Sequence, residues 1–564
     1  MKPIKYQAYT ELSAIVVFFI LLNIVVSFFN WRVDLTEDKR FTLSEPTILL
    51  LENLDDVVYV QVFLDGELPS GFRKLKESTR DMLAAFKVHA GDNIQFEFID
   101  PSAMGSKKQV REYYEELIEA GIEPINLEVK REDESVQKII FPWVQLYYKN
   151  KPFQVKILQE QVGKHPTQVL SDSEAALEYE LANALRKMQI HQKPKIAYIS
   201  DYGTLNDTLT ADFRKSIEPY YEVLDIEISR YKVEIIENFD MAIIAGPKER
   251  FEEVDKYKID QFVMRGGKVI WLLETLEASL DSLDERGIGY TKSRDLNLDD
   301  QLFKYGVRVN EDLVQDLQSH AIPVMSNLPG SQGSRDFKPW TYYPVVFPSS
   351  THPIVNNLNA IWFQFANSLD TVGPKNIQKT PLLSSSENSR LAFHPVRLNL
   401  QNIGKKPNER LFNDGHKTLA ILLEGNFTSV FKNRIAPSTL ESGDYGTFLE
   451  EAEAESKQIV IGDASVISNQ YSVMRDEIYP LGFDRFTNQT FGNRNFMLNC
   501  VDYLLDDSGV LSLRSKSVKI RMLDNKKLKA DKTFWQVMNL GVPIVIIFLL
   551  GFIFNVIRWR NYAR

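Results

Sequence analysis

The hydrophobic pattern of the chain has a long apolar run near each end. The first run, Leu12 to Phe29 (LSAIVVFFILLNIVVSFF), contains three polar residues, and the second extends from Phe534 to Ile557. A bilayer core of about 30 Å needs roughly 20 apolar residues to cross it as a helix. The pattern therefore predicts two transmembrane helices, over residues 12–30 and 534–557.

A cleaved signal peptide is the alternative interpretation of the first run. Signal peptides end in a small-x-small cleavage site, whereas this run ends in Ser-Phe-Phe-Asn-Trp-Arg. We therefore predict an uncleaved anchor. Polar groups and prolines inside membrane helices tend to face other helices. Contacts with other membrane subunits are accordingly expected at Asn23, Asn539 and Pro543.

Between the apolar runs, the pattern alternates between strand-like and helix-like segments. Residues 31–192 contain alternating or apolar strands such as Val57–Leu64 and Ile94–Ile99, separated by amphipathic segments such as Phe72–His89. Ser44, followed by Glu45 and Pro46, is a helix N-cap signal. The order of these segments predicts a thioredoxin-like α/β domain.

Residues 193–513 are predicted to form a second α/β domain. Its strands are apolar throughout, as in Lys268–Leu273 (KVIWLL), and they are separated by helical segments. Such strands are typical of a doubly wound parallel sheet. The stretch 276–455 is less regular and is predicted to be an insertion, after which 456–505 supplies the closing strand and helix.

The predicted organisation along the membrane follows from these segments. Residues 514–533 are a basic linker, and residues 1–11 and 558–564 lie on the opposite side of the membrane from the middle. The lysines and arginines of the linker would by themselves favour a cytoplasmic middle region. Long domains, however, cross the membrane largely regardless of charge, so charge alone does not fix the sidedness.

Composition excludes several classes of function. The net charge of -10 argues against a nucleic-acid-binding protein, which needs a basic surface. The single cysteine, Cys500, cannot form an internal disulfide, a CxxC pair or a cysteine-based zinc site, and it lies in an apolar run typical of a buried helix.

Motifs for common catalytic sites are also missing from the sequence. No segment matches a P-loop or a G-x-S-x-G elbow, and the seven histidines show no metal-binding spacing. We therefore predict a protein that is not an enzyme and has no catalytic residues, metal site or cofactor.

One possible ligand pocket follows the ends of two predicted strands. Glu274 and Thr275 follow the strand 268–273 and stand where glutamine-amidotransferase-like folds carry a cysteine nucleophile. Asp463, Ser465 and Asn469 lie in the loop into which the segment 456–463 runs after its buried strand, and ligands of open α/β sheets bind at such strand ends. Helix capping by Asp463 or Ser465 is the alternative interpretation.

The whole chain resembles a known family. Four segments carry the resemblance: DLTEDKRFTLSEPT from Asp34, FDMAIIAGPKERFEEVDKYKIDQFVMRGGKVIWLLE from Phe239, YGVRVNEDLVQD from Tyr305 and VIGDASVISN from Val460. With the two terminal anchors, they resemble the gliding-motility-associated ABC transporter auxiliary subunit, GldG, of Bacteroidota.

The resemblance implies a two-pass protein of the bacterial inner membrane, with both termini cytoplasmic and the middle periplasmic. It also implies an ABC permease and a cytoplasmic ATPase as partners, a role in gliding motility, and contact with periplasmic motility or secretion components. Two alternatives remain at this point. One is a membrane-tethered ligand-binding or sensor module, and the other is an amidotransferase-like hydrolase that uses carboxylates such as Glu274.

Overall fold

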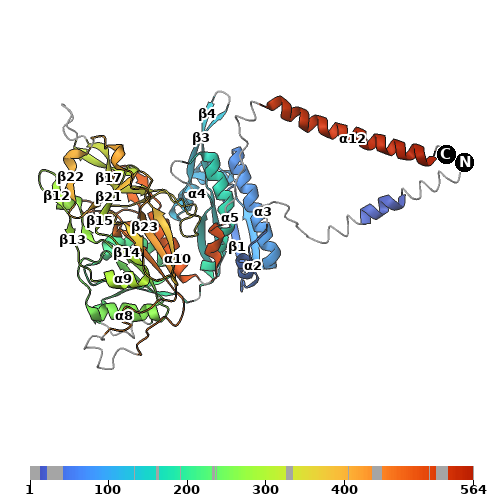
Figure 1. The fold of residues 1–564 in the computed structure, drawn as a ribbon. Coiled ribbons are helices and arrows are strands. Elements are labelled where there is room, and N and C mark those ends of the chain that lie inside the picture. The colour runs from blue at the N-terminus through green and yellow to red at the C-terminus, as the bar shows by residue number, and fades with distance from the viewer. Residues whose placement is uncertain are drawn as a thin grey trace. The chain divides into compact units, whose positions relative to one another are not determined.

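The computed structural model describes residues 13–21, 42–131, 134–159, 164–190, 192–230, 236, 238–325, 335–403, 405–434, 447–506, 508–515 and 531–562. The chain divides into two units, residues 1–517 and residues 518–564. The described part of the first unit beyond residue 42 is a mixed α/β body, as the sequence predicts (Figure 1).

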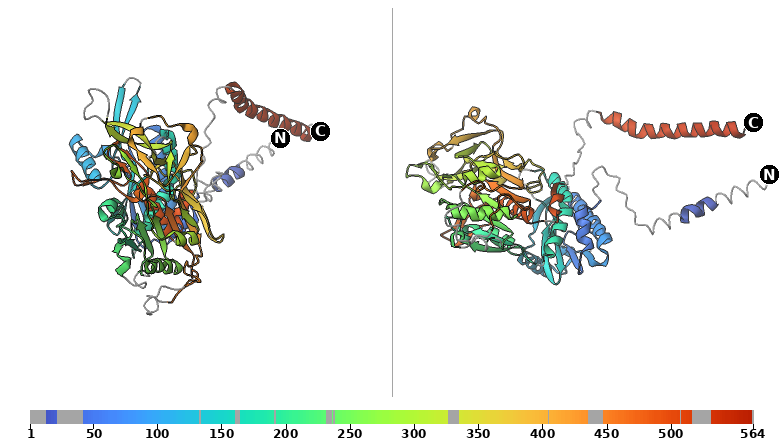
Figure 2. Two further views of the ribbon diagram at one scale, coloured as in Figure 1. Left: turned by 60° about the vertical axis from the view of Figure 1, so that its left-hand side comes forward. Right: turned by 60° about the horizontal axis from the view of Figure 1, so that its bottom comes forward.

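The N-terminal part of the body is built on a four-stranded sheet in the order β2-β1-β5-β6. Strands β1 (Val58–Val62) and β2 (Ile94–Phe98) are parallel, while β5 (Trp143–Tyr148) and β6 (Lys151–Lys156) are antiparallel additions. A separate hairpin of β3 (Ile125–Arg131) and β4 (Glu134–Ile140) extends away from this sheet (Figure 2).

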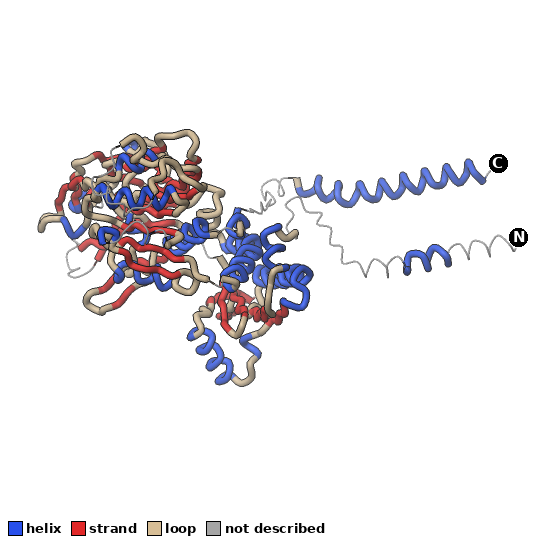
Figure 3. Tube along the Cα trace, turned by 90° about the horizontal axis from the view of Figure 1, so that it is seen from below, coloured by secondary structure: helices blue, strands red, loops and turns tan. Residues whose placement is uncertain are grey.

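Three helices share an apolar core with this sheet: α2 (Glu45–Glu52), α3 (Ser70–Ala90) and α5 (Pro166–Met188). Figure 3 shows the helices of this part gathered beside its strands. Ser44 caps α2 as predicted, because its side chain accepts a hydrogen bond from the backbone N–H of Thr47. A fourth helix, α4 (Lys107–Glu119), begins with a capping box and contributes Leu117 to a smaller cluster.

The second part of the body is built on a seven-stranded sheet in the order β20-β23-β24-β10-β9-β7-β8. Five neighbouring strands are parallel: β8 (Glu222–Ile226), β7 (Lys195–Ile199), β9 (Met241–Ala245), β10 (Lys268–Leu272) and β24 (Ser456–Ile461). All five residues of β9 are buried, as expected for a central strand covered on both faces.

Helices cover both faces of this sheet. On one face, α6 (Asp207–Ile217) and α10 (Asn493–Leu505) pack in a large apolar cluster that includes Phe213 and Phe496. On the opposite face, α8 (Glu253–Met264) and α9 (Asp299–Tyr305) contribute to a second cluster through Phe262 and Leu302. The parallel strands are therefore enclosed between two helical layers.

The stretch 276–455 departs in part from the predicted insertion, because two of its strands belong to the central sheet. Strand β23 (Thr418–Gly425) pairs antiparallel with β24, and β20 (Gln378–Ser384) pairs antiparallel with β23. The run TLAILLEG has five consecutive buried residues, which gives β23 the burial of a central strand.

Most of the remaining strands are short and form small sheets, several of which contribute to an aromatic-rich cluster that includes Trp340, Tyr343 and Trp362. These strands are β11 (Leu276–Glu277), β12 (Ile288–Tyr290), β13 (Lys292–Ser293), β14 (Val307–Val309), β15 (Asp312–Asp316), β16 (Ser319–Met325), β17 (Arg335–Val346), β18 (Ile361–Trp362), β19 (Leu369–Thr371), β21 (Ser389–Phe393), β22 (Arg397–Asn399), β25 (Tyr471–Ser472), β26 (Glu477–Ile478), β27 (Phe483–Asp484) and β28 (Gln489–Thr490).

A buried charge network joins the two parts of the body. Asp502 on α10 receives hydrogen bonds from Arg186 on α5 at 3.2 Å and from the Tyr221 hydroxyl at 2.6 Å, and it pairs with Lys187 at 3.0 Å. Burial alone would raise the pKa of Asp502, but Lys187 and Arg186 outweigh burial and lower it below its ordinary value. The carboxylate is therefore held ionised at the junction.

The body begins and ends at the same place. The short helix Val510–Ser515 contributes Val510 and Leu511 to the core of α2, α3 and α5. A Cβ atom built on Gly509 would lie 3.8 Å from Cγ of Pro46 in the first turn of α2. Glu178 on α5 accepts hydrogen bonds from the Ser44 backbone and the Thr47 hydroxyl, so α5 holds the start of the body in place.

The second unit contains the predicted C-terminal span. Helix α12 (Lys532–Tyr562) includes one stretch, Lys532–Arg560, that is long and apolar enough to cross a membrane. Asn539 and Pro543 lie within it. Of the predicted N-terminal span, residues 13–21 are helical, while the rest, including Asn23, lies outside the described residues.

Candidate functional site

A cleft lies beside the carboxyl ends of the central parallel strands. Its volume is about 620 Å³, and Glu274 from the segment after β10 and Ser465 from the segment after β24 both line it. Asn469, a third residue predicted for a pocket, also lines it. The opposite wall comes from the small sheets and includes His320, Tyr343 and Trp362. The cleft size is ordinary for a small-ligand site.

The crevice at the strand-order reversal, between β7 and β9, is filled by the protein itself. Leu205 donates its backbone N–H to the carbonyl of Ala245 at the end of β9. Gly246 follows with a φ of 61°, and a Cβ there would lie 2.8 Å from that of Ala464. A larger residue at Gly246 would collide with Ala464, and the open space lies instead beside β10 and β24.

Glu274 is held at the cleft wall by two contacts. Its Oε2 accepts a hydrogen bond from Arg294 at 2.8 Å, and its Oε1 accepts one from the backbone of Ala464 at 3.3 Å. Its side chain keeps about a quarter of its surface exposed, at 26%. Arg294 thus offsets part of the negative charge of Glu274.

Asp463 lies beneath the cleft floor, fully buried. Its carboxylate accepts hydrogen bonds from the backbone of Gln364 at 2.5 Å and from the backbone of Ser465 at 2.7 Å. It caps the short helix Ala464–Ile467, so the capping interpretation describes its role in the fold. Burial and the neighbouring charge of Glu274 raise the pKa of Asp463 to about 8, although these hydrogen bonds lower it.

The raised pKa predicts a pH-dependent stability. Between pH 4 and 8 the folded protein keeps a proton on Asp463 that the unfolded chain has lost, so stability from this group falls as pH rises. Asp463→Asn cannot ionise. From pH 4 to pH 8, the free energy of unfolding of the wild type is expected to fall by at least about 1 kcal/mol more than that of the variant. Denaturant titration across this range measures the difference. Equal slopes for both proteins would contradict this.

Thr275 and Asn469 are both engaged by hydrogen bonds within the protein, and Asn469 also lines the cleft. Thr275 donates its backbone N–H to Asn367 at 3.0 Å and its hydroxyl to the carbonyl of Asn310 at 2.9 Å. Asn469 donates to the carbonyl of Thr208 at 3.0 Å and accepts from the backbone of Asp212 at 3.2 Å. Of the five predicted pocket residues, Glu274 and Ser465 keep the most accessible side chains at the cleft.

The opposite wall contains residues that the sequence did not point to. His320 lies 2.9 Å from the carboxylate of Asp484, and its ring packs edge-to-face against Trp362 with centroids 5.0 Å apart. Burial alone would raise the pKa of Asp484, but hydrogen bonds from His320 and Thr487 outweigh burial and lower this pKa to about 2. These residues come from separate short strands, so no sequence spacing signals their proximity.

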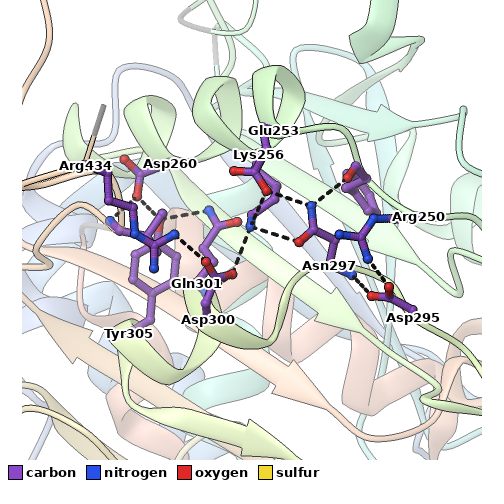
Figure 4. A network of polar contacts seen from close by, with 12 residues as sticks. Arg250, Glu253, Lys256, Asp260, Asp295, Asn297, Asp300, Gln301, Tyr305 and Arg434 are labelled. Atoms are coloured by element: carbon purple, nitrogen blue, oxygen red, sulfur yellow. Dashed lines mark hydrogen bonds and ion pairs between the residues drawn. The ribbon is translucent and has the colours of Figure 1, made fainter. Parts of the chain in front are cut away.

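A second polar network lies around α8 (Figure 4). Lys256, fully buried, donates to Asp300 at 2.9 Å and lies 3.3 Å from Glu253. Asp260 accepts hydrogen bonds from the hydroxyls of Tyr305 at 2.8 Å and Ser429 at 2.6 Å. These charges have partners within the protein, and we interpret the network as structural.

The covering segment, residues 427–434 and 447–453, encloses the outer face of α8. The backbone N–H of Val430 donates to Asp260 at 3.0 Å. Gln261 exchanges hydrogen bonds with the backbone of Leu449, at 2.8 and 3.0 Å. Polar side chains of α8 thereby obtain partners despite burial, which explains how a helix with so many charged residues can be buried on every side.

Nucleophile and metal chemistry find little support in the geometry. Cys500 is buried in the core of α10, and burial raises the pKa of its thiol far above the usual value, so it stays protonated. Among the described residues no group of three histidine, cysteine or acidic side chains is placed to hold a metal ion.

Comparison with known proteins supplies the family. The family described as "ABC-type uncharacterized transport system" matches residues 193–500, which cover the whole seven-stranded sheet. The chain belongs to this ABC transport family. Residues 37–147 match in addition a domain of unknown function. The family indicates an auxiliary, transport-related role, and together with α12 it indicates association with a membrane.

Two further similarities accompany the family match. An uncharacterized protein of Borreliella burgdorferi is 21% identical over 551 residues, covering 96% of this chain and 93% of that protein. Among solved structures, the mmIFT52 N-terminal domain is 15% identical with a TM-score of 0.31, covering 56% of this chain and 98% of that one. The low TM-score supports no structural argument.

Proposed function

We propose that this member of the ABC transport family is a non-catalytic, membrane-anchored auxiliary subunit of an ABC transporter. Its body would lie in the periplasm and couple an ABC permease and a cytoplasmic ATPase to periplasmic partners or cargo. The observation that carries the proposal is the family match over residues 193–500, in a chain that also has the apolar helix α12. The resemblance to GldG supports gliding motility as the process served.

The geometry of the body agrees with two anchors. We propose that residues 31–192 form a thioredoxin-like domain, that residues 193–513 form the doubly wound domain, and that residues 12–30 and 534–557 cross the bilayer. Pro46 and Gly509 lie side by side, so the chain enters and leaves the body at one place. Two neighbouring membrane helices could hold such a body without distorting it.

Co-purification tests the partnership. The full chain, carrying an affinity tag and solubilised in detergent, is expected to retain a permease and an ATPase subunit identified by mass spectrometry. A tagged membrane protein of unrelated function serves as the control. Recovery of the chain without any ATPase-bearing partner would contradict the proposed role.

Deletion of α12 tests the anchors. With residues 531–564 removed, the chain is expected to remain in the membrane pellet after alkaline carbonate washing, because residues 12–30 supply a second span. Removal of both segments is expected to release the body. Release of the intact protein, or release after the first deletion alone, would contradict the two-anchor proposal.

Two further measurements test the side of the membrane on which the body lies and the proposed role in gliding. Alkaline phosphatase inserted between Lys406 and Pro407, two exposed loop residues, is expected to be active, since this enzyme works outside the cytoplasm. Deletion of the gene in a gliding bacterium is expected to abolish gliding. Phosphatase inactivity or normal gliding would contradict the corresponding part of the proposal.

A ligand-binding or sensor role is the second candidate function. The cleft beside β10 and β24 favours it, because its volume and its mixed aromatic and polar lining suit a small ligand. An amidotransferase-like hydrolase has less support, since Glu274 is engaged by Arg294 and stands where that fold carries its cysteine.

A further inference from the structure

The cleft runs along the free edge of strand β16. Among the described strands β16 pairs with β17 alone, and four consecutive residues, His320 to Pro323, line the cleft. Successive side chains of a strand point to opposite faces, so a cavity that touches every residue in turn lies against the edge of the strand. The cleft is therefore bordered by backbone as well as by side chains, and backbone groups of an edge strand can bind another extended chain.

Two prolines determine which backbone groups of β16 point away from β17. Ala321 lies opposite Pro339, and two residues further along β16 the chain has Pro323. Because proline has no N–H, neither position can exchange two hydrogen bonds across the ladder, so those bonds belong to the pair between them, Ile322 with Lys338. The N–H and C=O of Ala321 and the C=O of Pro323 therefore point to the side on which β16 has no described partner strand.

Two opposite charges also line the cleft, and within the described ranges neither belongs to an ion pair. Asp281 is exposed. Arg485 packs over the ring of Phe486, with 4.7 Å between its guanidinium carbon and the ring centroid, and it donates to the carbonyl of Tyr471 at a long 3.4 Å. A guanidinium has five N–H donors, so most of those of Arg485 remain available to a ligand.

The other carboxylates at the cleft already have partners. Glu274 pairs with Arg294 at 2.8 Å, and Asp484 lies 2.9 Å from His320. A purely anionic ligand would face all of these carboxylates, and a purely cationic one would leave Arg485 without a partner. A ligand that has one charge of each sign complements the cleft best.

From these features we infer that the cleft binds a short zwitterionic peptide in an extended conformation. Its backbone pairs with the free edge at Ala321 and Pro323, as extended peptides do when they add to a sheet. Its terminal ammonium pairs with Asp281, and its terminal carboxylate accepts hydrogen bonds from Arg485. Pro323 offers no donor, which suits a ligand of few residues rather than a long added strand. This inference deepens the ligand-binding candidate and does not depend on the transporter partnership.

The direct test titrates the full chain in detergent with tetrapeptides by calorimetry. Tetraalanine, tetraserine and an alternating alanine–leucine tetrapeptide are the probes, and at least one is expected to bind with a dissociation constant below about 1 mM. The N-acetylated form, the C-terminal amide and free alanine are each expected to bind about ten-fold more weakly, because each lacks one of the three contacts. Absence of binding by all three tetrapeptides would overturn the inference. Equal binding of a tetrapeptide capped at both ends would also overturn it, and would assign the edge to an internal segment of a protein partner.

Two charge-removing substitutions locate the termini. Arg485→Gln is expected to weaken binding of the free tetrapeptide about ten-fold and to leave binding of its C-terminal amide unchanged. Asp281→Asn is expected to do the same for the free and the N-acetylated peptide. Arg475→Gln and Glu285→Gln, at exposed positions outside the cleft lining, are the matched controls and are expected to leave affinity unchanged. Unchanged affinity in both cleft variants would refute the assignment.

A third substitution tests the strand edge. Ala321→Pro removes an N–H that points away from β17, so the pairing of β16 with β17 is retained. Free and capped peptides are expected to lose affinity by the same factor, about five-fold, the effect of one lost hydrogen bond. Full affinity in a folded Ala321→Pro variant would contradict backbone pairing at this edge.

Discussion

Asp502→Ala is expected to lower the free energy of unfolding of the body by about 3–5 kcal/mol. The substitution removes the carboxylate that pairs with Arg186 and Lys187, whose side chains are only 11% and 13% exposed, while Arg186 keeps its longer contact of 3.7 Å with Asp506. It also removes the acceptor for the Tyr221 hydroxyl. The measurement is denaturant unfolding of the full chain in detergent, followed by tryptophan fluorescence.

The control and the pH dependence make this prediction specific. Asp225→Asn breaks an ion pair with Arg214 in which Asp225 is 42% exposed, and less than about 1 kcal/mol should be lost. Because the folded pKa of Asp502 is lowered, its stabilising effect is present above the unfolded value near 3.8 and is lost as pH falls through the folded value. A difference between wild type and Asp502→Ala that does not shrink in acid would contradict the ionic explanation.

Asp260→Asn is expected to destabilise the protein by about 3 kcal/mol and to release the covering segment from α8. The fully buried Asp260 accepts four hydrogen bonds, from Tyr305, Ser429, Val430 and Gln261. An asparagine amide turns one acceptor into a donor that faces other donors. Proteolysis within residues 427–453 is expected to accelerate, because Ser429 and Val430 lose their partner.

Asp295→Asn provides the comparison for this second prediction. Asp295 pairs with Arg250 in the same network, but its side chain is 68% exposed. Exposed ion pairs contribute at most about 1 kcal/mol, so stability and proteolysis should change little. If the two variants lost equal stability, burial of Asp260 would not be the cause of its effect.

The strands that could best be predicted from the sequence are those that are apolar throughout. The runs that form β7, β9, β10 and β24 are short, buried and bounded by turn residues, and they lie next to one another in the sheet. Strand β23 has the same character, but it lies among polar loops within 276–455. Its antiparallel pairing with β24 depends on contacts between distant segments that local periodicity does not encode.

Only the wall of the cleft that is formed by loops after the strand ends could be predicted from the sequence. The rule that ligands bind beyond strand ends led to Glu274 and Ser465, which line the cleft. The same rule could not separate them from Thr275 and Asn469, because only the fold shows that the Thr275 hydroxyl donates to the carbonyl of Asn310 and the Asn469 amide to that of Thr208. His320, Tyr343 and Trp362 come from three separate strands, β16, β17 and β18, whose meeting depends on tertiary packing.

The proximity of Pro46 and Gly509 has a consequence for how such proteins can evolve. A globular portion whose two ends nearly coincide can be inserted into, or removed from, a host polypeptide without changing the spacing of the flanking segments. The region from Ser44 to Ser515 has this property, since one core holds both of its ends. Different globular modules could therefore be exchanged in such a chain by recombination at two positions that lie side by side in the fold.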